Sequence, residues 1–583
     1  MYDILTESSD FLVRIVFLRA LAFVHAVAFL VALRQNKALI GDNGITPARR
    51  ILNQAESRGR QNAERRMQWR QTSVSQGETM LPPSEKKGRF IVLFAKARSM
   101  LRTVAQQLDT NPKFVKIRET WWDRTDSLNR PLTTLLWLAK DRQRLNPWLD
   151  NLALTGLVLS SIIFVSGAAN VPLVLGIWLC QRSLMAVGGP FYGFGWEPQL
   201  AELSFHALFM VPLLALQQIP NNLPIPKPVS WSIRWYLFRI MMGAGLIKLK
   251  SGDPKWKWPA LNAMDYFYET QPVPNPFTRY FHWMPPKWHK FEVLVNHFVE
   301  LVAPWLLIIP GLPTPWRRAG GIIQLIFQAV LIMSGNLSFL NWLTMVPAIL
   351  CLDDALLGPL FSNSKQTAAM AAAWTYQLSP MRQIISWSFL GAILWLSIPV
   401  VRNLLAKKQV MNSSFDPLRL VNTYGAFGTV NEVREEFVIM AAPTVEGPWR
   451  EYEFQVKPGD PNRAPKWISP YHHRLDWQMW IAANCRTLDR SPWMFNFLIK
   501  LLQQDQAVLA LMAGDPFAEE PPHLQPKYIR IDKFAYNFHK PKNGQQDSPY
   551  WDRKCLGRVY PRQGVASLET LKDEIKGQPR RAL

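Results

Sequence analysis

Cysteine is scarce in this chain of 583 residues, which contains only Cys180, Cys351, Cys485 and Cys555. Four cysteines are too few for a disulfide-rich scaffold. Cys180 and Cys351 lie in apolar segments, so Cys485 and Cys555 are the only pair that could form a bridge. The sequence does not establish whether their Cα atoms come within bonding range, so this pairing stays open.

Motifs of several common enzyme classes are also absent. The chain has no glycine-rich phosphate loop, no serine between glycines at a nucleophile elbow and no His-Glu-x-x-His helix. The enzymes that depend on those motifs are therefore excluded. We predict no catalytic residue, no cofactor and no metal.

Acidic residues are few relative to basic ones. Lys and Arg number 66, Asp and Glu number 43, and the net charge is +23. The basic excess is densest between Arg49 and Arg144, where no nucleic-acid recognition motif occurs. We interpret this stretch as a solvated loop near anionic headgroups, so membrane lipid is the expected partner and nucleic acid is not.

Long apolar runs, in contrast, are plentiful between Phe11 and Leu405. Residues 11–33 are long enough to cross a hydrocarbon core, which needs roughly 20 helical residues. They lack a basic start and a cleavage site, so we predict an uncleaved first membrane helix. Further apolar segments lie at 152–165, 171–187, 203–216, 231–249, 291–309, 319–333, 339–352 and 384–405. We therefore predict a polytopic α-helical membrane protein with about 8–9 candidate membrane helices, some of them re-entrant or interfacial.

The character of the sequence changes after Lys408. Segments 436–440, 452–456 and 528–536 are β-prone, whereas 492–512 has helical periodicity. We predict a C-terminal soluble domain that is β-rich, sandwich-like and α+β in class. The chain is thus divided into a first membrane helix (1–34), a polar basic loop or insertion, partly disordered (35–146), a multi-helix membrane domain (147–408) and the β-rich domain (409–583).

Six ionisable residues fall in or near the apolar segments: Glu202, His206, Arg234, Arg239, His297 and Glu300. Such groups are costly in a membrane and usually face the bundle interior in pairs. The first two are four residues apart and the last two are three apart, so each pair shares a helix face. Two such faces could form a metal site, but no cysteine or third histidine joins them. Charge pairing with one of the two arginines is the favoured interpretation.

Five short motifs follow one another along the chain. They are 188–197 (GGPFYGFGWE), 422–427 (NTYGAF), 452–460 (YEFQVKPGD), 474–480 (RLDWQMW) and 550–554 (YWDRK). Together they resemble the lipase maturation factor family, over most of the chain outside roughly 50–130. The tripeptide at 471–473 departs from the family's pattern.

The resemblance implies a multi-pass protein of the endoplasmic-reticulum membrane that assists folding and assembly of secreted lipases. Its C-terminal domain would be lumenal, and its partners would be client lipases together with other folding factors of that compartment. Such a role requires a binding surface, so we expect a maturation factor and not an enzyme.

The 474–480 motif allows two physical interpretations. If it is extended, Arg474 and Asp476 share a face, and Trp477 and Trp480 offer the large apolar surfaces typical of binding hot spots. The motif could then grip a client. Alternatively, a buried bridge between Arg474 and Asp476 and core tryptophans hold the domain together, which is the favoured interpretation because buried polar groups normally have partners.

A shorter stretch, 243–249 (GAGLIKL), resembles a membrane segment of vitamin K-dependent γ-glutamyl carboxylases, in which a lysine serves as base. An alternative, carboxylase-like enzyme would depend on Lys248, because desolvation makes a lysine easier to deprotonate. Another alternative is a small-molecule transporter that uses the intramembrane charges. We favour a structural Lys248 that ends a helix and reaches the interface.

Two sequons bear on topology. Asn336 is expected to lie too close to the membrane, whereas Asn412 is a glycosylation site if the C-terminal domain is lumenal. A cytosolic N-terminus and an odd number of spans would deliver the domain there. The basic first loop favours the opposite orientation, but charge bias loses force for loops beyond about 60 residues.

Overall fold

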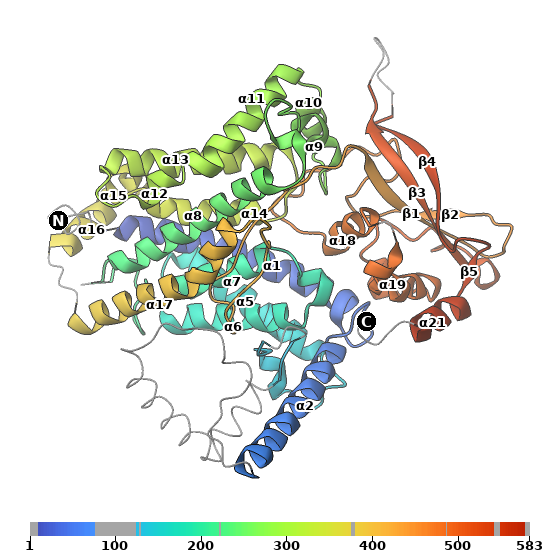
Figure 1. Ribbon diagram of the computed structural model, residues 1–583, viewed down its shortest axis with the longest axis horizontal. Coiled ribbons are helices and arrows are strands. Elements are labelled where there is room, and N and C mark those ends of the chain that lie inside the picture. The colour runs from blue at the N-terminus through green and yellow to red at the C-terminus, as the bar shows by residue number, and fades with distance from the viewer. Residues whose placement is uncertain are drawn as a thin grey trace.

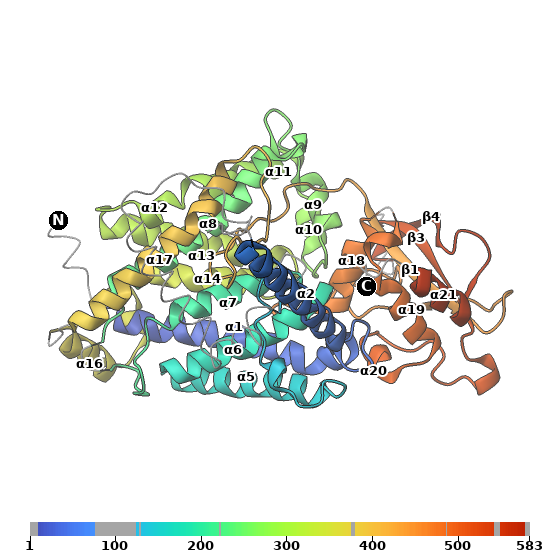
Figure 2. The same cartoon turned by 60° about the horizontal axis from the view of Figure 1, so that its bottom comes forward.

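The structure is a computed structural model that describes residues 10–75, 124–126, 130–220, 223–374, 379–485, 487–540 and 549–577. These residues form two parts that lie side by side, a large bundle of helices and a smaller part built on a β-sheet (Figure 1). The view in Figure 2 shows the same division. We call the two parts the bundle and the C-terminal domain.

The bundle combines long helices with short linking ones. The longer helices are α1 (Phe11–Ile40), α2 (Ala48–Ser75), α5 (Asn146–Ser166), α6 (Val171–Val187), α7 (Trp196–Ala207), α8 (Lys227–Lys250), α11 (Pro286–His297), α13 (Thr314–Ser334), α16 (Asn363–Trp374) and α17 (Pro380–Leu405). The shorter ones are η3 (Leu135–Leu138), η4 (Gly189–Tyr192), η5 (Pro254–Trp256), α9 (Met264–Thr270), α10 (Thr278–His282), η6 (Phe298–Val302), α12 (Trp305–Ile308), α14 (Leu340–Ala348), η7 (Ile349–Cys351), α15 (Asp354–Leu357) and η8 (Gly358–Leu360).

Fewer helices than predicted are long and apolar enough to cross a membrane. Among the described residues there are four: Phe11–Ile40, Asn146–Ser166, Pro286–Ile308 and Pro380–Leu405, or five if the bent pair around residue 352 is one span. The predicted count of 8–9 is not confirmed. Several predicted segments are too short, since α6 has 17 residues and α7 has 12.

Helix α1 is the central helix of the bundle. Its apolar window is 61% buried, against 33% for α5 and for α17, which fits a helix that is apolar all round. Gly156 of α5 allows a close approach, because a Cβ there would lie 2.3 Å from the ring of Phe29. At one end of α1 the Phe11 N–H donates to Asp354, and near the other end Gln35 donates to the His472 carbonyl in the C-terminal domain. Helix α1 therefore runs the length of the bundle toward that domain.

The connection between α1 and α5 starts and ends at the domain-facing end of the bundle. The Asp42 carboxylate accepts from the Leu145 and Asn146 N–H groups, and the Asp42 N–H donates to the Asn146 side chain. Part of the 35–146 loop, which was predicted to be partly disordered, is helical, because α2 covers 48–75. Residues 76–123 of the basic stretch lie outside the described residues.

The C-terminal domain contains one antiparallel sheet in the order β2-β1-β3-β4, with β5 paired to β3. The strands are β1 (Arg434–Ala442), β2 (Arg450–Tyr452), β3 (Tyr528–Phe538), β4 (Trp551–Tyr560) and β5 (Ala566–Ser567). In the register Ile439 pairs with Ile531, and both are fully buried. The predicted β-prone segments 436–440 and 528–536 thus correspond to β1 and β3, whereas 452–456 shares only residue 452 with β2 and β4 was not predicted.

Helices complete this domain: α18 (Arg474–Ala483), η9 (Leu488–Arg490), α19 (Trp493–Leu502), α20 (Gln506–Leu509), η10 (Pro522–Leu524) and α21 (Leu568–Gly577). Of these, α18 contacts β1, α19 contacts β3 and α21 contacts β5 (Figure 1), so the described part of the domain is a single sheet with helices packed on it and not a sandwich of two sheets. The single helix predicted over 492–512 is two helices, because Gln504 adopts a φ of 53° between them.

Candidate functional site at the seam

Two of the five motifs, far apart in sequence, meet where the bundle contacts the C-terminal domain. We call the contact between 188–197 and 472–480 the seam. Residues 188–197 form a tight connection between α6 and α7, in which Gly189 has a φ of 54°. A Cβ on Gly188 would lie 2.1 Å from the ring of Tyr192. The glycines therefore allow the chain to turn back and to present Tyr192 and Glu197 toward α18.

Arg474 and Glu197 form a buried ion pair across the seam. Arg474 Nη1 lies 2.7 Å from Glu197 Oε1, and neither side chain is exposed. The same Nη1 donates to the Phe191 carbonyl at 2.7 Å, and the guanidinium lies 3.7 Å from the centroid of the Tyr192 ring. Gln181 of α6 donates to Glu197 Oε2 at 2.7 Å. Removal of one partner would leave an uncompensated charge in this site.

The bridge predicted between Arg474 and Asp476 is wrong because the motif is helical. Residues two apart on an α-helix point about 200° apart, so these side chains cannot share a face. Asp476 Oδ1 instead accepts from the N–H groups of Val456 (2.7 Å) and Lys457 (3.0 Å). Asp476 therefore holds the 452–460 motif within the domain while Arg474 reaches across the seam.

Aromatic rings fill the rest of the seam. The ring of Trp477 lies 4.9 Å from that of Trp196 and 5.6 Å from that of His472. Phe194 stacks on Trp196 at 4.7 Å with an angle of 2° between the rings. Such pairs add to the free energy of apolar burial. Trp477 is buried, so it contributes to packing between the two parts.

Helix α1 also takes part in the seam. Gln35 accepts from the Arg474 N–H at 3.0 Å and donates to the His472 carbonyl at 2.7 Å. His472 is fully buried, and this burial, with Arg474 and His473 nearby, holds its pKa well below the usual value. A neutral imidazole is therefore part of the packed seam.

Trp480, the last residue of the 474–480 motif, lies at the edge of the seam. Its indole N–H donates to the Thr270 carbonyl of the bundle at 3.0 Å, and its side chain is half-buried. It lines a cavity of about 340 Å³ together with Phe267, Phe427 and Cys485. Trp480 is thus more accessible than Arg474, Asp476 or Trp477.

A third motif docks on the bundle through Glu202. Glu202 forms an ion pair with Arg239, and its Oε2 accepts from the Asn422 N–H at 3.0 Å and the Tyr424 hydroxyl at 2.6 Å. A Cβ on Gly243 of α8 would lie 2.2 Å from the Tyr424 carbonyl. The expected charge pairing of Glu202 with Arg239 is therefore present, and it also anchors the 422–427 motif.

The other expected polar groups are placed separately. His206 contacts Ser232 at 3.0 Å through Nδ1 and does not join Glu202. The guanidinium of Arg234 lies 4.4 Å from the centroid of the Trp231 ring. His297 contacts the Trp256 carbonyl at 2.8 Å. Within the described ranges, no group of three or more His, Cys, Asp or Glu side chains is arranged to hold a metal ion.

Lys248 was predicted to reach the membrane interface, but its side chain is buried. Its ammonium lies 2.6 Å and 2.7 Å from the two carboxylate oxygens of Glu300 and 2.8 Å from Asn296 Oδ1. The Trp256 ring covers it at 4.8 Å. Glu300 belongs to η6, a π-helical turn that follows α11. Three acceptors satisfy the three ammonium protons, an arrangement suited to joining α8 to η6.

The remaining predictions concern the two glycosylation sequons and the possible disulfide between Cys485 and Cys555. Asn412 is exposed, whereas Asn336 is buried and its amide donates to the Pro274 and Lys466 carbonyls. Cys485 and Cys555 are both free thiols, so the disulfide left open by the sequence is not formed in this structure.

The sequence did not identify the partners of Arg474. Glu197 ends the 188–197 motif, but its role was not predicted, and Gln35 and Gln181 are polar residues in largely apolar helices. A polar residue inside an apolar helix is a usable signal, since it normally has a buried partner. The identity of that partner depends on tertiary structure.

Comparisons with known proteins match almost the whole chain. The family model of the lipase maturation factor transmembrane domain matches residues 12–110 and 111–358, and that of the lipase maturation factor C-terminal domain matches 420–561. Lipase maturation factor 1 of Mus musculus is 40% identical over 97% of this chain and 89% of the relative, and that of Homo sapiens is 39% identical over 96% and 89%. Lipase maturation factor 2 of Mus musculus is 28% identical over 75% and 76%. No solved structure matches.

Proposed function

Because this chain belongs to the lipase maturation factor family, we propose that it assists the maturation of secreted lipases without catalysing a reaction. The observation that carries this proposal is the 40% identity to a lipase maturation factor over 97% of the chain, which includes both parts of the molecule. The candidate membrane spans and the similarity to lipase maturation factors support a place in the endoplasmic-reticulum membrane.

In this proposal the bundle holds the C-terminal domain in the lumen. The N-terminal end of α1 and the C-terminal domain lie at opposite ends of the bundle, which supports a cytosolic N-terminus and a lumenal domain. Asn412 would then be glycosylated. The connection between α1 and α5 would face the lumen as well.

The seam residues act in this proposal by fixing the domain. Arg474, Asp476 and Trp477 are buried, so they support client binding indirectly. Client lipases would contact accessible parts of the domain, including Trp480 and the edge strand β4, where Leu556 is 49% exposed. In the described structure β4 pairs with β3 along one edge, and its other edge is open to an incoming strand.

The test uses cells that lack this protein and secrete a lipase. Wild type and a chain that ends after Lys408 are expressed at equal levels, and secreted lipase activity and lipase protein are measured. We expect activity with wild type only. Equal rescue by the truncated chain, or a normal lipase in cells without the protein, would contradict the proposal.

A further inference from the structure

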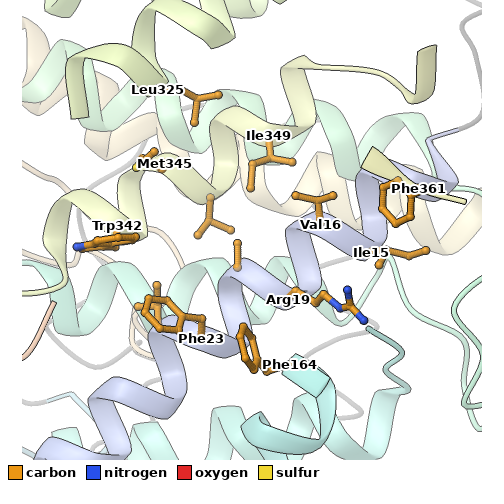
Figure 3. Close-up of a pocket in the computed structure, with 13 residues that line it drawn as sticks. Ile15, Val16, Arg19, Phe23, Phe164, Leu325, Trp342, Met345, Ile349 and Phe361 are labelled. Carbon is orange, nitrogen blue, oxygen red and sulfur yellow. The ribbon is translucent and has the colours of Figure 1, made fainter. Parts of the chain in front are cut away.

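A groove of about 480 Å³ opens among α1, α5, α13 and α14 in the bundle. Figure 3 shows its walls, to which α1 contributes Val16 and Phe23 and α14 contributes Trp342 and Met345. All of the lining residues are described, and among them Arg19 alone is charged. The volume falls within the range of about 300–1,000 Å³ that is typical of ligand pockets.

Arg19 has unused hydrogen-bonding capacity. Its Nη2 donates to the Val165 carbonyl at 3.1 Å and its Nε is buried against Gly167, whereas no hydrogen bond among the described residues uses its Nη1. No carboxylate of the described residues forms an ion pair with it. A guanidinium in apolar surroundings is normally paired, so its position beside the groove favours an anionic ligand.

The position of Arg19 matches the level of a lipid headgroup. Arg19 contacts the C-terminal end of α5, a helix of 21 residues that is about 31 Å long at 1.5 Å per residue, close to the thickness of a hydrocarbon core. From Arg19 the groove extends along α1 toward Trp342, which donates to Ser469 of the C-terminal domain. In the other direction the lining continues to Ile15 and Phe361, so Arg19 lies beside the middle of the groove and apolar walls extend on both sides of it (Figure 3).

We propose that this groove binds one acyl chain of a bilayer phospholipid whose anionic headgroup pairs with Arg19. Phe164, at the rim, is 45% exposed, so a chain can enter sideways from the surrounding lipid. An acyl chain gains little hydrophobic free energy on moving from the bilayer into the groove, because lipid tails are equally apolar. Selectivity for a lipid class must then come from the guanidinium, which binds anionic oxygens in a fork.

The experiment reconstitutes the full chain in phosphatidylcholine vesicles that contain a minor fraction of photoactivatable lipid. The probe is phosphatidylserine or phosphatidylcholine with the same diazirine-labelled acyl chain, and labelled peptides are mapped by mass spectrometry. We expect labelling of α1 and α14 in the groove, with a preference for phosphatidylserine of about fivefold, as for one basic residue near an anionic headgroup.

Four variants sharpen the result. Arg19→Gln should abolish the preference for phosphatidylserine, and Arg19→Lys should keep most of it because the charge remains. Ala20→Phe should fill the groove and reduce labelling by both lipids. Val158→Phe, on the lipid-facing side of α5 and outside the groove, is the matched control and should leave labelling unchanged. Equal labelling of wild type by the two lipids, or no enrichment of label in the groove, would overturn the proposal.

Discussion

Two buried ion pairs connect different parts of this molecule. Arg474 and Glu197 join the C-terminal domain to the bundle, whereas Lys248 and Glu300 join α8 to η6 within the bundle. Exposed fractions are 0% for both members of the first pair and 5% and 6% for the second. Both pairs are buried to a similar extent. Burial therefore does not show whether a pair joins the two parts of the molecule, stabilises the bundle from within or includes a catalytic lysine. These roles can be distinguished by the effect of breaking each pair.

The largest effect is expected when one member of the seam pair is removed. Arg474→Met leaves the Glu197 carboxylate buried and unpaired, which costs about 3–5 kcal/mol. Limited proteolysis should then release the C-terminal domain, and the purified protein should unfold at a lower temperature. In the double variant Arg474→Met/Glu197→Met no charge remains unpaired, so most of the stability should return. A double variant as unstable as the single one would show that the pair is not the main cause.

Single and double variants of the same design distinguish a structural role of Lys248 from a role as a catalytic base. Lys248→Met should also destabilise the protein by about 3–5 kcal/mol, because Glu300 loses its partner. If Lys248 is structural, Lys248→Met/Glu300→Met should recover both the unfolding temperature and lipase secretion. Recovery of stability without recovery of secretion, at normal protein levels, would instead favour the carboxylase-like alternative.

A smaller effect is expected at Asp476, which acts inside the C-terminal domain. Asp476→Ala removes the acceptor for Val456 N–H and Lys457 N–H and should cost about 1.5–3 kcal/mol, the value of a hydrogen bond to a charged group. Thermal unfolding of the variant is compared with that of Asp573→Ala, a change on the exposed surface of α21. A similar unfolding temperature for the two variants would argue against this role of Asp476.

The smallest effect is a pH dependence of the seam. The pKa of His472 is lowered in the folded protein, whereas in the unfolded chain it returns to about 6.5. Below that pH the unfolded chain binds the proton more readily, so stability is full above pH 6.5 and declines as the pH falls. The unfolding temperature of the wild type should therefore decrease from pH 7.5 to 5.5. The decrease should be less steep in His472→Phe. In the control His523→Gln, which changes an exposed histidine, it should be as steep as in the wild type. Equal slopes in wild type and His472→Phe would exclude His472 as the cause.

Much of the architecture follows from local sequence properties. The first helix and strands β1 and β3 were predicted because hydrophobic length and alternation are local signals. Strand β4 was missed, since most of its residues are exposed at a sheet edge and four of the ten are charged. The predicted number of spans was not confirmed, because several apolar segments form short helices in the bundle.

The candidate site was only partly predictable. The motif residues were identified, and the preference for a structural role of Arg474 and Trp477 agrees with their burial. Their partners were not identified. The assumption that 474–480 is extended paired Arg474 with Asp476, so Glu197 was not considered as its partner. Lys248 was expected at an interface because a helix end usually allows it, but α11 and η6 place Asn296 and Glu300 around it. Such contacts are fixed by tertiary packing.

The most direct test of the seam's function is secreted lipase activity in cells that lack this protein. Cells are supplied with wild type, Arg474→Met or Arg474→Met/Glu197→Met at matched expression. If a fixed C-terminal domain is needed for lipase maturation, activity should be lost with the single variant and largely regained with the double one. Full activity with the single variant, when proteolysis shows that its domain is released, would contradict a role for the seam in maturation.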